Sequence, residues 1–397
     1  VVWGYVVKRH GPVRWVRLAA PSPGAGAPSG LAELRRVLLR DSAWPLALAD
    51  ASESERMGRR VWRERLEPLL PALVNIQHLI VLDSKGMEYV PVESWVDGRG
   101  RPAVERFAIS YAPSASVYAL LHARGRTRPL ADPERALVVG DPRLTEPALS
   151  SRLALQNAMT SSRVALSGFA RGRASGPTPA MRQLTWARSE LVAVSSRFER
   201  ATVLTGVNAS EAKVRSALGT AREAPYSVVH FAAHTLQNRH RQSPVSLLLE
   251  GTSVNRPPSE PLAASPDDGW LTSDEVGALE VPAEMVTLSA CRTAGFYDFG
   301  GFVGLGDAFL RAGASCVVMS LWEVDDHATE LLMRTFYGQL SGLRRSDGNT
   351  ADRAPDRALA LARAKCDLRN YTDADGRHPY SHPAYWSGFI LVGDSGH

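Results

Sequence analysis

Two residues whose side chains could act together in catalysis, Cys291 and His234, each follow a short apolar run. The runs read VTLSAC before the thiol and YSVVHFAAH before the imidazole. Such runs predict buried parallel strands, and ligands bind at the carboxyl ends of these strands. A thiol and an imidazole at neighbouring strand ends form a dyad in which the imidazole takes the thiol proton. The sequence therefore predicts Cys291 as a nucleophile and His234 as its base, 57 positions apart (291 minus 234).

The other cysteines and histidines in these runs fit structural roles. Cys316 lies in a valine-rich run and Cys366 in a helical pattern, where a free cysteine is usually a small buried hydrophobe. His230 lies four residues before His234, in the middle of the strand, so we expect it in the core. The spacing HFAAH imitates a zinc-binding helix, but the glutamate of H-E-x-x-H is missing and the preceding valines favour a strand. The sequence predicts no metal site.

Four more residues could shape a substrate site at the same sheet edge. Ser289 is small and leaves room for a substrate backbone, and the peptide N–H of Cys291 can donate to a developing oxyanion. Asp325 and Asp326 follow the next apolar run and could bind a basic substrate side chain, or Asp326 could cap the following helix. Trp322 could form an apolar wall of the pocket or pack in the core.

Alternating strands and helices are expected to position these residues. Apolar runs typical of strands lie at 78–82, 107–111, 136–140, 201–205, 226–234, 245–250, 286–291, 314–322 and 382–393. Helical spacing occupies 31–40, 55–70, 184–198, 270–279, 305–312, 327–340 and 354–369, and residues 1–20 have a hairpin pattern. This alternation predicts βαβ units and a mostly parallel sheet. Because it occurs twice, we expect two α/β halves, residues 1–183 and 184–397.

Composition narrows the class of protein. No apolar run approaches the ~20 residues of a membrane-spanning helix. The chain has three cysteines without a C-x-x-C pair, which argues against a disulfide framework and favours a reducing cytoplasm. The net charge of +5 comes largely from dispersed arginines, so we do not expect direct nucleic-acid binding. A start without Met suggests a cut from a longer chain or a processed product.

Several ordered motifs carry a resemblance to a known family. They read VHFAAH, GWLTSDEVGAL, VTLSACRTA, GLGDAFLRAGASCVVMSLWEVDDHATELLMRTFYGQL and HPAYWSGFILVGD, with LIVLDSKGMEYVPVESW and YAPSAS in the N-terminal half. Together they resemble the CHAT domain, a caspase- and separase-like cysteine protease module of clan CD. The resemblance implies a caspase-like, mostly parallel sheet sandwiched by helices. It also implies a preceding pseudo-caspase half, in agreement with the two halves expected above.

The resemblance further implies a cysteine endopeptidase that needs no cofactor. Cys291 falls on the nucleophile of the family and His234 on its base. The family commonly has Gly after the catalytic His, where the N–H helps to form the oxyanion hole. Here Thr235 occupies that place, so its N–H is expected to donate together with that of Cys291, while its Cβ restricts the backbone.

A biological role is expected from the same resemblance. Such modules often act beside sensor domains, sometimes in bacterial defence or regulated-death pathways. We therefore expect a protein substrate and a regulatory sensor domain or partner protein, with no membrane association. The P1 residue, which precedes the scissile bond, would be Arg or Lys if Asp325 binds it, or apolar otherwise. The alternative from another class is a catalytically silent caspase-like interaction module.

Overall fold

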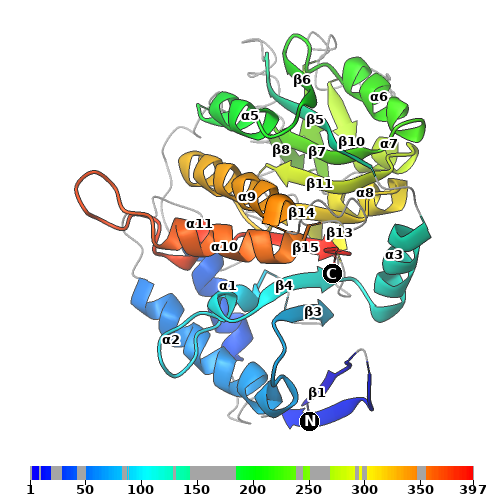
Figure 1. Ribbon diagram of the computed structural model, residues 1–397. Helices are drawn as coiled ribbons and strands as arrows, with labels where there is room; N and C mark the ends of the chain where they lie inside the picture. The colour runs from blue at the N-terminus through cyan, green and yellow to red at the C-terminus, as the bar shows by residue number, and fades with distance from the viewer. Residues whose placement is uncertain are drawn as a thin grey trace, which may run out of the picture. The chain divides into compact units, whose positions relative to one another are not determined.

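The structure is a computed structural model, and its described residues form two compact units (Figure 1). It describes residues 2–8, 10–18, 29–42, 51–82, 87, 89–127, 131–143, 185–237, 245–250, 269–290, 295–296, 302–346 and 355–396, with the backbone alone at 126, 295–296, 302–303 and 344–346. The first unit comprises Val1–Arg128, Phe296–Phe302 and Val318–His397, and the second comprises Pro129–Gly295 and Val303–Val317. Each unit is described by itself.

The first unit begins with the antiparallel hairpin β1 (Val2–Val6) and β2 (Arg14–Leu18). Its other strands follow the order β3-β4-β15-β14, and β3 pairs with β4, and β4 with β15, in parallel. The bounds are β3 (His78–Leu82), β4 (Ala108–Ala112), β14 (Cys316–Ser320) and β15 (Phe389–Gly393). The helices are α1 (Gly30–Asp41), α2 (Ala51–Val61), α3 (Ala115–Thr127), α9 (Asp326–Ser346), α10 (Arg357–Arg369) and α11 (Pro383–Trp386). Strand β14 starts in the last residues of the second unit.

The second unit has four parallel strands in the order β11-β7-β5-β6. Their bounds are β5 (Asp132–Pro142), β6 (Arg200–Gly206), β7 (Tyr226–Ala232) and β11 (Ala283–Ser289), with helices α5 (Ala187–Ser195), α6 (Glu211–Gly219) and α8 (Leu305–Ala312). A separate antiparallel sheet holds β8 (Thr235–Gln237), β9 (Val245–Leu248) and β10 (Trp270–Thr272), followed by α7 (Ser273–Gly277). The short strands β12 (Gly295–Phe296) and β13 (Phe302–Val303) pair with each other.

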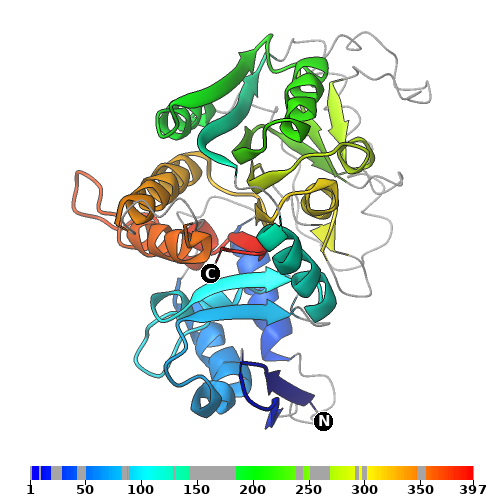
Figure 2. The ribbon, with the colours of Figure 1, turned by 45° about the vertical axis from the view of Figure 1, so that its right-hand side comes forward.

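Strand β7 shows why the second unit is layered. All seven of its residues are buried, as expected for a parallel strand covered on both faces. Successive side chains point to opposite faces, so His230 and Phe231 meet different helices. His230 contacts Glu190 of α5, and the Phe231 ring lies 5.6 Å from that of Phe309 on α8. Helices therefore cover both faces of this sheet, and the layers can be followed in Figure 2.

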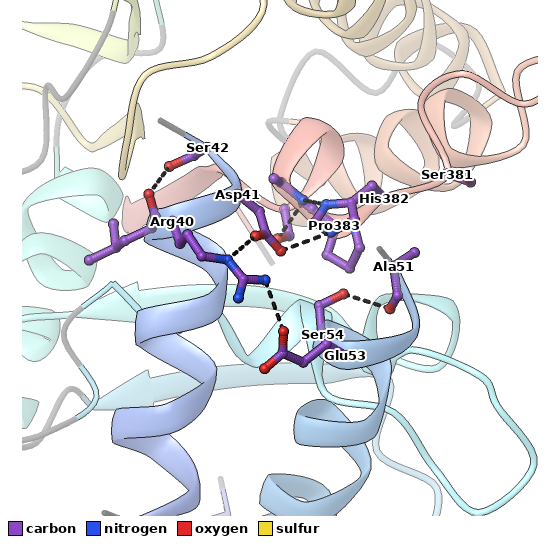
Figure 3. A network of polar contacts seen from close by, with 12 residues as sticks. Arg40, Asp41, Ser42, Ala51, Glu53, Ser54, Ser381, His382 and Pro383 are labelled. Carbon is purple, nitrogen blue, oxygen red and sulfur yellow. Dashed lines mark hydrogen bonds and ion pairs between the residues drawn. The ribbon is translucent and has the colours of Figure 1, made fainter. Parts of the chain in front are cut away.

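In the first unit a polar network that is buried at Asp41 and His382 links α1, α2 and α11 (Figure 3). His382 caps α11 because its Nδ1 accepts the Ala384 N–H at 3.1 Å. A neutral ring must then carry its proton on Nε2, which lies 3.2 Å from Asp41 Oδ2 at the end of α1. Arg40 donates to the other oxygen of Asp41 at 2.7 Å and to Glu53 of α2 at 2.9 Å. The pairing with Arg40 offsets the cost of burying the Asp41 carboxylate.

A second buried cluster fixes α10 against β4. The Lys365 ammonium lies 2.7 Å from Glu93 Oε1, and these side chains are only 1% and 2% exposed. The Tyr111 hydroxyl donates to Glu93 Oε2 and accepts the Val92 N–H at 2.8 Å. The partners come from positions far apart in the chain, so only the folded structure assembles this cluster.

Most expected elements are present, and the differences have identifiable causes. The helix expected over 55–70 ends at Val61 and continues as a π turn and a 3-10 segment, where Pro68 and Pro71 cannot donate to a helix ladder. Residues 270–272 form β10 rather than helix because they pair with β9, and α7 starts at Ser273 behind a capping box. Helix α3 was not expected. The two halves expected from the sequence, residues 1–183 and 184–397, are each one continuous segment. Each compact unit instead combines segments from different parts of the chain.

Candidate active site

His234 lies where the parallel strand β7 gives way to the antiparallel strand β8. The strand ends at Ala232, and the His234 carbonyl accepts the Leu248 N–H at 2.8 Å. The imidazole is half-buried. Gly140 of β5 makes room for this bend, because a Cβ there would lie 2.4 Å from the Ala232 carbonyl oxygen. The backbone on both sides of His234 is therefore held by neighbouring strands.

The register between β11 and β7 places Ser289 beside the end of β7. Thr287 pairs with His230, and Ser289 pairs with Ala232 as the last register pair of the two strands. Ser289 is buried, and its hydroxyl has no hydrogen-bond partner among the described residues. Cys291 itself lies outside the described residues. A buried hydroxyl in this state calls for a ligand or a neighbour, since an unsatisfied polar group is costly.

The ladder between β8 and β9 fixes the direction of the Thr235 N–H. Opposed residues of an antiparallel ladder alternate between hydrogen-bonded and non-hydrogen-bonded pairs. The bond from Leu248 to His234 makes that pair hydrogen-bonded, so the adjacent pair, Thr235 with Leu247, is non-hydrogen-bonded. The N–H of Thr235 therefore points to the side of β8 opposite β9.

A buried histidine–glutamate pair lies beneath this strand end. His230 Nε2 is 3.0 Å from Glu190 Oε1, and neither side chain is appreciably exposed. His230 stands in the middle of β7, as expected for a core histidine, and Glu190 reaches it from α5. The pair anchors α5 to the strand that carries His234. No local pattern in the sequence points to Glu190, because its contact with His230 spans 40 residues.

Three of the expected substrate residues belong to the first unit. Asp325 is exposed, and its Oδ1 accepts the Ala328 N–H at 2.8 Å, so it caps α9. The sequence pointed to Asp326 as the cap, but the helix begins one residue earlier than expected and Asp326 lies in its first turn. Trp322 is buried and donates its indole N–H to the Ala384 carbonyl at 2.9 Å. The role of Trp322 as an apolar wall of a substrate pocket stays a prediction.

A group of tyrosines that the sequence did not single out includes two, Tyr380 and Tyr385, that sense the charge of Asp325. The Tyr380 ring lies 5.5 Å from Tyr371 and 5.1 Å from Tyr385, and the Tyr380 hydroxyl is 2.7 Å from His327 Nδ1. Burial, and next the negative charge of Asp325, raise the pKa of Tyr380 to about 12. The same two causes raise the pKa of Tyr385. Both phenols therefore stay neutral at physiological pH, and the negative charge of Asp325 opposes their ionisation.

The two cysteines that the structure describes are poor nucleophiles. Cys316 is buried, with its Sγ 3.5 Å from the Glu284 carbonyl oxygen. Burial and the charge of Glu105 raise the pKa of Cys366 to about 11. A thiol of this kind is almost wholly protonated at neutral pH and reacts slowly.

Among the residues that the structure describes, no three side chains of the His, Cys, Asp and Glu types are gathered closely enough to hold a metal ion. Within the same ranges, no helix combines the length and the apolar character that crossing a bilayer requires.

Comparison with known families adds to this geometry. The model of the CHAT domain matches residues 55–394, which is most of the chain. The chain belongs to the CHAT domain family. Its fold is α/β, with mostly parallel strands flanked by helices.

Relatives of this CHAT chain include tetratricopeptide repeat protein 28 of Homo sapiens and of Mus musculus. Each is 30% identical over 124 residues, which is 31% of this chain and 4% of that protein. The chain thus matches only a small part of these relatives.

Two solved structures are among those similar to the CHAT chain. The separase–securin complex of Saccharomyces cerevisiae is 11% identical with a TM-score of 0.36, covering 72% of this chain and 14% of that one. The Arg-specific cysteine proteinase gingipain R is 8% identical with a TM-score of 0.45, covering 90% and 69%.

Proposed function

We propose that this CHAT chain is a cysteine endopeptidase in which Cys291 is the nucleophile and His234 the base. The observation that carries the proposal is the register of β7 and β11. Ala232 and Ser289 are partners, and His234 and Cys291 each follow their strand's last paired residue by two positions. Parallel strands deliver such positions to the same edge of a sheet, where α/β proteins bind ligands.

The proposed reaction uses only side chains and backbone of the chain. His234 takes the proton of Cys291, and the thiolate attacks a peptide carbonyl carbon. The oxyanion accepts hydrogen bonds from the backbone N–H groups of Thr235 and Cys291. His234 then protonates the leaving amine, and water hydrolyses the thioester. The β8–β9 ladder supports the role of Thr235, because it directs that N–H away from β9.

We propose a protein substrate with a basic P1 side chain. Asp325 carries an exposed carboxylate, and the neutral rings of Tyr380 and Tyr385 lie within reach of its charge. A carboxylate beside aromatic faces favours Arg or Lys through charge-assisted hydrogen bonds and cation–π contacts. Asp326 and Trp322 are proposed as neighbours of this subsite, and the Ser289 hydroxyl as a partner of the substrate backbone.

The proposed setting is regulated proteolysis in the cytoplasm of a bacterial cell, in defence or regulated death. Activation would come from a sensor domain or a partner protein. Tetratricopeptide repeat protein 28 is named for its repeats, and the matched segment is a small part of that protein. That combination supports a regulatory module outside the segment that is shared.

The test is cleavage of a mixed peptide library by the wild-type chain, by Cys291→Ala and by a matched control, Cys366→Ala, with a chelator present. We expect cleavage that is lost in Cys291→Ala alone and follows basic residues. Cleavage that survives Cys291→Ala would overturn the proposal.

The second candidate is a catalytically silent interaction module, favoured by Thr235 in place of the usual glycine. It predicts no cleavage and no activation of Cys291. A peptide aldehyde with a basic P1 side chain separates the two, because an intact dyad forms a reversible hemithioacetal with it even when turnover is slow.

A further inference from the structure

The N-terminal hairpin has an outer face of exposed aromatic side chains. In the antiparallel register of β1 and β2, Trp3 is the partner of Arg17 and Tyr5 is the partner of Trp15. Alternation places these four side chains on one face, and Gly4 and Leu18 on the other. The inner face packs on the 3-10 segment Glu67–Ala72, where a Cβ at Gly4 would lie 3.1 Å from Leu69 Cδ2. The outer face is thus presented to solvent by a supported hairpin.

The size of this face is unusual for a surface without a partner. Trp3 is 55% exposed, Tyr5 45% and Trp15 63%. With about 150–250 Å² for each aromatic side chain, these fractions leave ~250–400 Å² of ring surface in water. The rings alone therefore approach the largest patch that a typical monomer exposes, about 300–600 Å², and such patches are usually functional. Exposed Val7 and Val13 extend the face toward the hairpin tip.

The charge around the face selects an anionic partner. Arg17 lies on the outer face, Lys8 and Arg14 are also exposed on the hairpin, and the first carboxylate in the sequence is Glu33. The supporting segment adds one exposed acid, Glu67, so the surface stays positive. Because Arg17 stands opposite Trp3, a cation and a ring lie side by side on the same face.

We propose that this hairpin face binds single-stranded nucleic acid. Aromatic rings on a β-surface provide stacking platforms for bases, and neighbouring cations neutralise phosphates. Trp3 and Tyr5 are two residues apart on one strand, hence ~6.8 Å, and Trp15 lies across from Tyr5 with ring centroids 5.2 Å apart. A hairpin that inserts in a membrane would need an apolar tip, but the exposed Lys8 and His10 lie there. Positive charges are dispersed over the whole sequence, so the net charge does not reveal the local group of cations on the hairpin.

The test is fluorescence anisotropy of labelled 12-residue oligo-U and oligo-dT titrated with the whole chain. We expect saturable binding whose log K falls with log salt by about 0.7 for each phosphate contacted. Alanine at Trp3 or Trp15 should weaken binding by a factor of roughly 5–150, the range for one stacked base. Arg17→Gln should reduce the salt slope by about 0.7.

The control variants test whether binding depends on this face or on any exposed tryptophan or arginine of the chain. Trp186→Ala removes an exposed tryptophan of the second unit, and Arg36→Gln removes an exposed arginine of α1, so both should leave binding unchanged. Circular dichroism checks that each variant is folded. The proposal is overturned if neither oligonucleotide binds at low salt or if Trp3→Ala/Trp15→Ala binds like wild type. It is also overturned if anionic phosphatidylserine vesicles or poly-glutamate compete for the face more strongly than oligo-U.

Discussion

Alkylation by iodoacetamide at pH 7.5 should distinguish Cys291 from the other two thiols of the chain. Cys366 has a pKa of about 11, so ~0.03% of it is thiolate at this pH, compared with ~10% of an ordinary thiol. The smaller thiolate fraction alone slows the alkylation of Cys366 ~300-fold. Its more basic thiolate is a better nucleophile, which offsets ~10-fold of that decrease. A net factor of ~30 therefore separates Cys366 from an unperturbed thiol, and a His234-activated Cys291 should react faster still.

The assay is peptide mass spectrometry over a time course, with a sample unfolded in urea as the reference in which all three cysteines react. We expect Cys291 to be labelled first and Cys316, which is buried, to be protected until the chain unfolds. His234→Gln should slow labelling of Cys291 alone, because the imidazole no longer takes its proton. Equal labelling of Cys291 and Cys366, or an unchanged rate in His234→Gln, would refute the dyad.

Three other substitutions test the fold and the site. Lys365→Met leaves a buried carboxylate unpaired and should cost about 3–5 kcal/mol in urea unfolding, whereas Arg369→Met, which breaks a half-exposed pair on the same helix, should cost below about 1 kcal/mol. Equal losses would show that burial does not set the difference. Gly140→Ala forces the end of β7 to move, so we expect peptide cleavage to fall, while Gly219→Ala has nothing within 4 Å and serves as its control. Unchanged cleavage would contradict that role. Asp325→Asn keeps a good helix cap but removes the charge, so cleavage after basic residues should fall ~10-fold or more relative to apolar ones. An ultraviolet pH titration should show tyrosine ionisation at lower pH in this variant, because the carboxylate no longer opposes it.

The sequence determined the features that depend on neighbouring residues. Strand β3 and helix α8 have the bounds that their apolar spacing predicts. Ser210 caps α6, and Thr272 with Glu275 forms the capping box of α7, because caps bind donors three residues away. His234 follows a buried strand as expected. These are local patterns, and a linear sequence displays them.

The tertiary structure decided what depends on register and on distant contacts. The direction of the Thr235 N–H follows from a ladder bond at Leu248, and the choice of Asp325 over Asp326 as cap follows from the helix start. The pair of Lys365 with Glu93 joins positions 272 residues apart. The outer face of the hairpin exists because the register sets Tyr5 against Trp15. Each depends on which chain segments meet, and no local pattern in the sequence contains that information.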